Sequence, residues 1–190
     1  MMLLHGEQEL VLPIDATTGL ARPLPSEARV EVRNRISRVF DKGSGALVVA
    51  DSLAADISTG LVLAVNRASI FLRGVGGFTG STKPPGVAGA SGQQPWELPG
   101  GMRPAARLPT AQLDTAIRPE GALIYRLLGD LNPLHADPAV SGAAGFEQPI
   151  LHGLCSLGVA GRSLIRELAG GDPRRLLRIR GRFSKHVLPG

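Results

Sequence analysis

The chain has 190 residues, of which 43% are hydrophobic, and a formal net charge of +5 at pH 7. It is long enough and apolar enough for one ordinary domain or two small ones, and it contains no apolar run of the length that spans a membrane. The positive charge favours an anionic partner, and a small phosphorylated ligand fits it as well as a nucleic acid does, while solvation is the commoner explanation of any single arginine. With 4% aromatic residues the chain shows no interleaved aromatic–basic platform, so we expect no nucleic acid.

Cysteine and histidine usage narrows the chemistry further. The single cysteine, Cys155, excludes an internal disulfide and is typical of a reducing compartment. The four histidines show no spacing of the C-x-x-C or H-E-x-x-H kind, so we expect no metal site.

Residues 26–40 alternate between apolar and charged positions, with Val30, Val32, Ile36 and Phe40 on one parity. This alternation predicts a half-buried strand. DKGSG at 41–45 has the composition of a turn, and residues 46–56 and 60–74 predict two further strands. The first part of the chain is therefore expected to be an antiparallel meander.

Residues 74–109 are rich in Gly, Pro and Ser, which predicts a linker or long loop that includes Trp96. The piece GVGGFTG within it also suggests a phosphate-binding glycine loop. Its spacing is not G-x-G-x-x-G, however, and the sequence Lys83-Pro84-Pro85 follows instead of a helical pattern. The linker is the favoured interpretation.

Three helices are predicted in the second part. The first covers residues 119–128 with Pro119 at its first position, and a short one ends near Gly145. The longest covers residues 152–171 and ends at Gly170-Gly171. Its inner face combines leucines and an isoleucine with two glycines that would let another backbone approach; the face consists of Leu154, Leu157, Gly158, Gly161, Leu164, Ile165 and Leu168.

Residues 176–183 alternate strictly, with apolar or small residues on one parity and Arg178, Arg180 and Arg182 on the other. This pattern predicts a strand with one buried face. A long helix with small inner residues, next to antiparallel strands, predicts a sheet wrapped round a helix.

A polar turn, GDLNPLHADP, occupies residues 129–138. Pro133 prevents a helix from running through it, so Asp130, Asn132 and His135 are presented on a rigid turn. Asp130 and His135 can hold one water between them for general acid–base chemistry, with either one as the base, and Asn132 can donate to Asp130 or to the water. The alternative is an Asx turn in which Asp130 or Asn132 only bonds the local backbone.

Longer segments carry a resemblance to a known family. YRLLGDLNPLHADPAVSGAAGF (125–146) resembles the signature of the hydratase 2 family, the (R)-specific enoyl-CoA hydratases of the MaoC type, and QPILHGLCSLGVAGR (148–162) resembles its next block. Shorter blocks resemble the hydratase domain of peroxisomal multifunctional enzyme type 2; they are LHGEQEL, RPLP, DKGSG, FLRGVGGFTG and RFSKHVLPG.

This resemblance implies an α+β double hot-dog fold, in which an antiparallel sheet wraps round a long central helix and the first repeat is degenerate. It implies a partial N-terminal repeat at 1–75, a linker at 76–112 and a C-terminal MaoC-like repeat at 113–190 that carries the catalytic turn. In the family the first repeat begins earlier and the second continues further. We therefore expect both repeats to be incomplete, without the first central helix and the last closing strands.

The implied activity is the reversible hydration of trans-2-enoyl-CoA to (3R)-3-hydroxyacyl-CoA in β-oxidation, with no cofactor and no metal. The implied partners are an acyl-CoA substrate and a second copy in a homodimer, without a membrane. The location would be the cytoplasm of a bacterium or the peroxisome of a eukaryote. Two alternatives stay open: a 3-hydroxyacyl-ACP or -CoA dehydratase of fatty acid synthesis, and a non-catalytic fragment.

The resemblance also implies roles for individual residues. Asp130, Asn132 and His135 would be catalytic, and the backbone N–H of Gly153 at the start of the long helix would be an oxyanion donor. Close packing is the alternative role of Gly153, and His152 is expected to be structural. The implied substrate contacts are His5, Gly6, Lys42, Leu131, Pro133, Leu134 and Phe183. The residues alone would make Lys42 a solvated turn lysine and Phe183 a core residue.

Overall fold

The computed structural model describes residues 2–78 and 111–190. Its first part contains the strands β1 (Met2–Val11), β2 (Val30–Asp41), β3 (Gly45–Asp56) and β4 (Val62–Arg73). Its second part contains α1 (Gly121–Arg126), α2 (Pro138–Ala143), α3 (Gly153–Leu168) and β5 (Arg178–Arg182), with short 3-10 helices at Pro133–His135 and Pro173–Arg175. Among the described residues, no helix has the length and apolar character needed to cross a bilayer.

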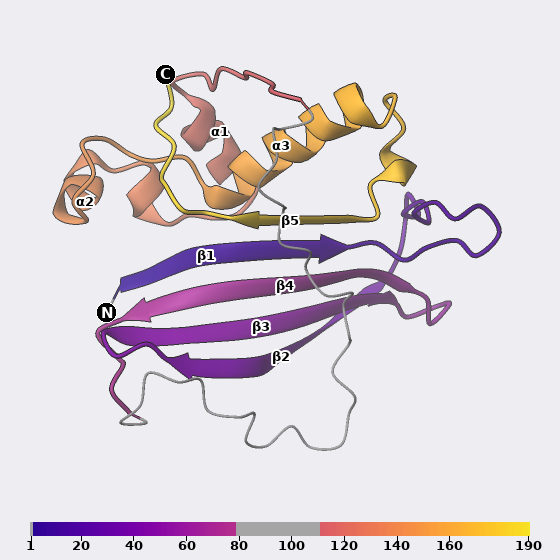
Figure 1. Ribbon diagram of the computed structural model, residues 1–190, viewed down its shortest axis with the longest axis horizontal. Coiled ribbons are helices and arrows are strands. Elements are labelled where there is room, and N and C mark those ends of the chain that lie inside the picture. Colours follow the sequence, from indigo (N-terminus) through magenta and orange to yellow (C-terminus); the bar gives the residue numbers. More distant parts are fainter. Residues whose placement is uncertain (1, 79–110) are drawn as a thin grey trace.

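All five strands form one antiparallel sheet in the order β2-β3-β4-β1-β5. The predicted meander is confirmed in β2-β3-β4, whereas β1 is a strand that the sequence pattern did not indicate. Because β5 pairs with β1, the two parts of the chain share a single sheet, and the helices gather on its β5 side (Figure 1). Most of the predicted linker, with Trp96 and the end of GVGGFTG, lies outside the described residues.

One face of the sheet carries a row of charges that crosses all five strands with alternating sign. The directly opposed residues are Arg35, Asp51, Arg67, Glu9 and Arg180. The carboxylates are the buried members, at 5% exposure for Asp51 and 3% for Glu9. Opposite charges at facing positions stabilise neighbouring strands.

The charged row also fastens the second part of the chain to the first. Glu9 pairs with Arg178 of β5, and Glu7 Oε2 lies 2.7 Å from Arg180 Nη2. Within the first part, Asp51 Oδ1 lies 2.7 Å from Nε of Arg67. The arginines of β5 therefore have partners on β1, and these contacts hold β5 in register.

The opposite face of β5 lies against α3. A Cβ built at Gly161 would lie 3.3 Å from the side chain of Ile179, and one built at Gly181 would lie 2.8 Å from that of Leu157. The predicted alternation of β5 is confirmed. The close approach expected at Gly161 occurs, but the neighbouring atom belongs to the Ile179 side chain and not to a backbone. The same expectation for Gly158 is wrong, because that position is exposed and has no atom within 4 Å of a built Cβ.

The predicted burial of the first strand is also wrong. β2 forms as a strand, but Val30, Val32 and Ile36 are 47%, 54% and 69% exposed. The reason is position: β2 is the edge strand farthest from β5, and α3 lies beside β5 at the opposite edge of the sheet. Alternation in sequence predicts a strand, but burial needs an element that covers it.

Helix ends follow local sequence in two of three cases. α3 ends with Gly170 and Gly171 at positive φ, and the Gly171 N–H donates to Ile165 O at 2.9 Å, as glycine termination predicts. The end of α2 near Gly145 is likewise confirmed. α1 is shorter than predicted, because Glu120 is its N-cap and Pro119 therefore precedes the helix.

Candidate active site

The polar turn between α1 and α2 is shaped by its own side chains. Asp130 Oδ1 accepts a hydrogen bond from the Asn132 N–H at 3.2 Å, and Asn132 Oδ1 accepts one from the Leu134 N–H at 3.1 Å. Both are Asx-type contacts, so the local-backbone alternative is realised. Asn132 reaches Asp130 through its backbone N–H and not through its side-chain amide.

Two histidines lie beside this turn with defined tautomers. His135 is 9% exposed, and its Nδ1 lies 2.7 Å from Ile150 O. A carbonyl oxygen only accepts, so Nδ1 carries the proton and Nε2 of the neutral ring is the acceptor. In the same way, Nε2 of His152 donates to Asp130 O at 3.3 Å.

His152 is the more deeply buried of the two, at 2% exposure. Its Nδ1 is buried and has no hydrogen-bond partner within residues 2–78 and 111–190. Burial, and next the neighbouring His135, lower the pKa of His152 below its usual value. At neutral pH this ring is therefore uncharged.

The turn and the histidines form one compact cluster. One side-chain oxygen or nitrogen from each of Asp130, His135 and His152 lies within 4.8 Å of those of the other two. Such a separation between a carboxylate and an imidazole suits a single bridging water. The rings of His135 and His152 stack with centroids 3.7 Å apart and an interplanar angle of 24°.

The same three residues are potential metal ligands, although their sequence spacing did not indicate one. The stacked geometry suits a metal poorly, because in-plane lone pairs of nearly parallel rings do not converge on one ion. The absence of a metal stays a prediction.

A second group of predicted residues meets at the start of α3. His152 is the N-cap and Gly153 the first helical residue, whose N–H has no carbonyl partner within the helix. A Cβ at Gly153 would lie 3.0 Å from Cδ2 of Phe183. The Phe183 ring meets the His5 ring edge-on at 5.1 Å, and the Phe183 N–H donates to Gly6 O at 2.8 Å. The packing and oxyanion roles of Gly153 are therefore compatible.

Not every predicted contact residue joins these groups. Lys42 lies in the β2–β3 turn, two to three strand spacings or about 10–14 Å from β1. It is exposed, and its Nζ lies 5.5 Å from the centre of the Phe40 ring; a substrate contact of Lys42 stays a prediction. Leu131, Pro133 and Leu134 belong to the polar turn itself, with Leu131 61% exposed.

A cavity of about 990 Å³ lies between α3 and the strands β1, β3 and β4, beside the contact of α3 with β5. Its floor is formed by side chains of β1, β3 and β4 and its roof by α3, and Tyr125 lines one end. The Tyr125 ring lies 4.8 Å from the ring of His152, so the cavity adjoins the cluster. Burial raises the pKa of Tyr125, which keeps its hydroxyl protonated. Sequence reasoning missed both Tyr125 and the cavity, although Ala50 and Ala68 give the floor small side chains.

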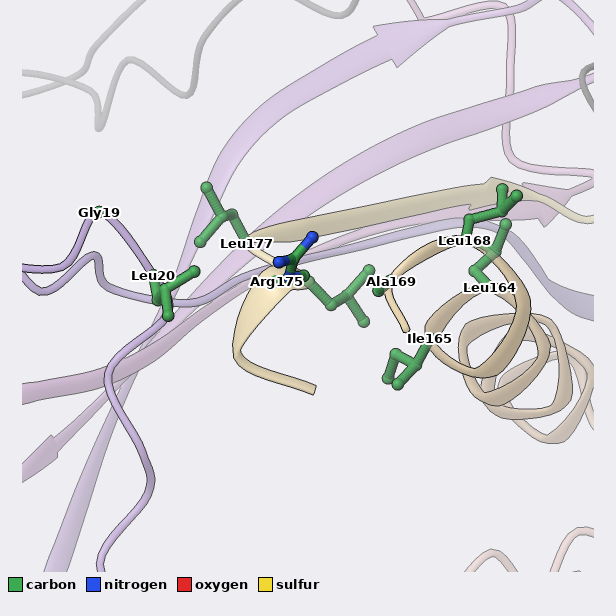
Figure 2. Close-up of a pocket in the computed structure, with 9 residues that line it drawn as sticks. Gly19, Leu20, Leu164, Ile165, Leu168, Ala169, Arg175 and Leu177 are labelled. Atoms are coloured by element: carbon green, nitrogen blue, oxygen red, sulfur yellow. The ribbon is translucent and has the colours of Figure 1, made fainter. Parts of the chain in front are cut away.

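A second cavity of about 520 Å³ lies toward the C-terminal end of α3. Leu164, Ile165 and Leu168 of the helix face the loop residues Gly19 and Leu20 across it, and Arg175 lies between them (Figure 2). The two cavities share two lining residues, Ile165 and Leu176. They therefore follow one another along α3.

Comparison with known proteins gives two consecutive domain matches. Residues 1–74 match the MFE-2 hydratase 2 N-terminal domain, and residues 103–190 match the MaoC like domain. The chain is similar to a probable enoyl-CoA hydratase 2 of Dictyostelium discoideum, with 40% identity over 191 residues that cover 100% of the chain and 58% of that protein. It is also similar to the peroxisomal enoyl-CoA hydratase 2 of Arabidopsis thaliana, with 36% identity over 189 residues that cover 100% of the chain and 57% of that protein.

A solved structure agrees with these matches. The crystal structure of a MaoC-like dehydratase from Phytophthora capsici has a TM-score of 0.77 and 35% identity, covering 100% of this chain and 59% of that one. The chain thus spans less than three fifths of the length of these relatives. The predicted α+β hot-dog class is confirmed by the antiparallel sheet, the long helix beside it and this likeness.

Proposed function

Because the chain belongs to the hydratase 2 family of MaoC-like proteins, we propose that it adds water reversibly to trans-2-enoyl-CoA in the β-oxidation of fatty acids. The product would be (3R)-3-hydroxyacyl-CoA. The observation that carries the proposal is one juxtaposition: side-chain polar atoms of Asp130 and His135 lie within 4.8 Å of each other, close enough to share one water, and Gly153 starts α3 directly after His152 of the same cluster.

The acid–base chemistry follows from the cluster. The substrate water lies between the Asp130 carboxylate and Nε2 of His135, which is free because Nδ1 is held by Ile150 O. As the water oxygen attacks Cβ, His135 takes one water proton, and the imidazolium then delivers this proton to Cα. Asp130 orients the water and stabilises the imidazolium. A positioned acid or base contributes about 10²–10⁴-fold to the rate.

The thioester oxygen becomes negatively charged as the enolate forms. The N–H of Gly153 points from the positive end of a 16-residue helix and donates to this oxygen. An oxyanion donor of this kind is worth about 10²–10³-fold in rate. The acyl chain enters the cavity beneath α3 through the end lined by Tyr125.

Several wider expectations belong to the same proposal. The substrate would be an acyl-CoA, the functional unit a homodimer, and the location the cytoplasm in a bacterium or the peroxisome in a eukaryote. The division into repeats at 1–75 and 113–190 remains a prediction. A second candidate is the reverse dehydration of a 3-hydroxyacyl thioester, which uses the same residues and which the name of the Phytophthora relative favours.

The direct test is a hydration assay on the purified chain with crotonyl-CoA and trans-2-decenoyl-CoA. Loss of the enoyl thioester absorbance, with formation of the 3-hydroxyacyl product, is the expected result. A folded, monodisperse chain that leaves both substrates unchanged and dehydrates no 3-hydroxyacyl-CoA would overturn the proposal.

A further inference from the structure

We infer that the cavity beneath α3 selects acyl chains that carry an oxygen substituent, a hydroxyl or a carboxylate, about ten carbons from the thioester. The inference rests on the proposed function only for the position of the thioester, at Gly153. What carries it is a stripe of polar side chains on the cavity floor and an arginine on the roof at the same level, whereas the roof nearer the start of α3 is apolar.

A stripe of amide and hydroxyl groups crosses the cavity floor. Asn66 lies directly opposite Ser52, and Ser52 lies directly opposite Asn34. Ser52 Oγ donates to Asn34 Oδ1 at 2.6 Å, and the buried Gln8 donates from Nε2 to Asn66 Oδ1 at 3.4 Å. Within residues 2–78 and 111–190, Nδ2 of Asn66 has no hydrogen-bond partner. A methylene chain would bury this donor unpaired, which costs free energy, whereas an oxygen substituent would accept from it.

The distance between the stripe and the thioester follows from the packing of α3. Gly153 packs against Phe183, and Gly161 packs against Ile179. Ile179 pairs with Leu10 and Leu10 pairs with Asn66 on neighbouring strands, so Asn66 is level with Gly161. Eight residues of helix rise about 12 Å, and four residues of β5 span about 13 Å. The two estimates agree, and an extended acyl chain covers this distance with about ten carbons at about 1.25 Å each.

A cation lies at the same level on the cavity roof. Arg162 follows Gly161 on α3, lines the cavity and is exposed. In the described part of the chain no carboxylate pairs with it, whereas the nearby Arg166 pairs with Glu167. The roof near Gly153 is formed instead by Leu154 and Leu157. An acyl chain in this cavity therefore passes Leu154 and Leu157 of the roof before it reaches Asn66 and an unpaired guanidinium.

The test compares trans-2-dodecenoyl-CoA with its ω-hydroxy and ω-carboxy analogues. We expect the oxygenated substrates to have a kcat/KM about 10-fold higher, mainly through KM, since about one charge-assisted or two neutral hydrogen bonds are gained. Asn66→Leu should reduce the preference for both analogues. Arg162→Gln should mainly reduce the preference for the ω-carboxy analogue. Arg33→Gln is the matched control, because Arg33 is 72% exposed on β2, and it should keep the wild-type ratio.

Isothermal titration with saturated dodecanoyl-CoA and its ω-carboxy analogue gives a readout that does not depend on catalysis. If the protein hydrates trans-2-dodecenoyl-CoA and both oxygenated analogues with equal kcat/KM, this inference is overturned and the proposed function stays intact. A chain without hydratase activity would refute the proposed function, and the titration would then decide the inference alone. If Asn66→Leu fails to fold, the exposed Arg162→Gln still decides it.

Discussion

Replacing Gly153 with alanine probes the contact between the start of α3 and the strand that follows it. The new Cβ would lie 3.0 Å from Cδ2 and 3.1 Å from Cγ and Cε2 of Phe183, where ordinary contacts are 3.4–4 Å. The ring cannot simply retreat, because His5 lies against it with ring centroids 5.1 Å apart. Either the ring or the first turn of α3 must therefore move by a few tenths of an ångström.

The size of the effect can be worked from this displacement. Overpacking of this kind costs about 1–3 kcal/mol of stability. Alanine keeps the backbone N–H, so any loss of rate reports on its position, and a misplacement of about 1 Å costs about 10²-fold. Because the shift at Gly153 is smaller than 1 Å, we expect Gly153→Ala to lower kcat about 10-fold, with a smaller change in KM.

A double-mutant cycle separates misplacement from other causes. Kinetics and urea unfolding are measured for Gly153→Ala, Phe183→Leu and the double variant. Because the smaller leucine relieves the contact, the double variant should recover at least about threefold in kcat over Gly153→Ala alone. The reasoning is refuted if Gly153→Ala retains the wild-type kcat, or if the two substitutions are simply multiplicative.

Three further predictions follow from other parts of the molecule. Burial opposes ionisation of Asp51, but the hydrogen bonds and charges of Arg67 and then Arg35 hold the pKa of its carboxyl below the usual value. Its contribution to stability is therefore present above the unfolded pKa of about 3.9 and is lost as pH falls through the lower folded pKa. Asp51→Asn should cost about 1–3 kcal/mol in urea unfolding at pH 7 and much less in acid; equal stability at pH 7 would contradict this. The hydration product should give no signal with an (S)-specific 3-hydroxyacyl-CoA dehydrogenase, and a strong signal would disprove the (3R) assignment. Since β5 is an edge strand among the described residues, light scattering should show concentration-dependent association, and a monomer at every concentration would count against it.

Sequence patterns predicted the features of this fold that depend on interactions between near neighbours in the chain. The alternation of β5, the glycine stop of α3 and the Asx contacts of Asp130 and Asn132 depend on a few neighbouring residues. β1 was missed because neither of its faces is consistently apolar: Glu7 and Glu9 point to the charged row and Gln8 to the cavity. A strand that is polar on both faces has no hydrophobic period to detect.

Contacts between distant residues explain the remaining differences. The stacking of His135 on His152 joins two segments through the packing of α3 beside the turn, and the structural role expected of His152 stays a prediction. The substrate contact that the family resemblance implies for Lys42 stays a prediction, because β4 lies between its turn and β1. The exposure of β2 likewise depends on where α3 lies, which its own sequence does not encode.

The most direct test of the account is the hydration rate of Asp130→Asn and His135→Gln beside two matched controls. Asp114→Asn and His186→Gln change exposed residues of the same types outside the cluster. The account predicts that each cluster substitution lowers kcat at least about 10²-fold, while the controls keep the wild-type rate and near-UV circular dichroism shows all four variants folded. Retention of more than about a tenth of the wild-type rate by either cluster variant would contradict the proposed mechanism.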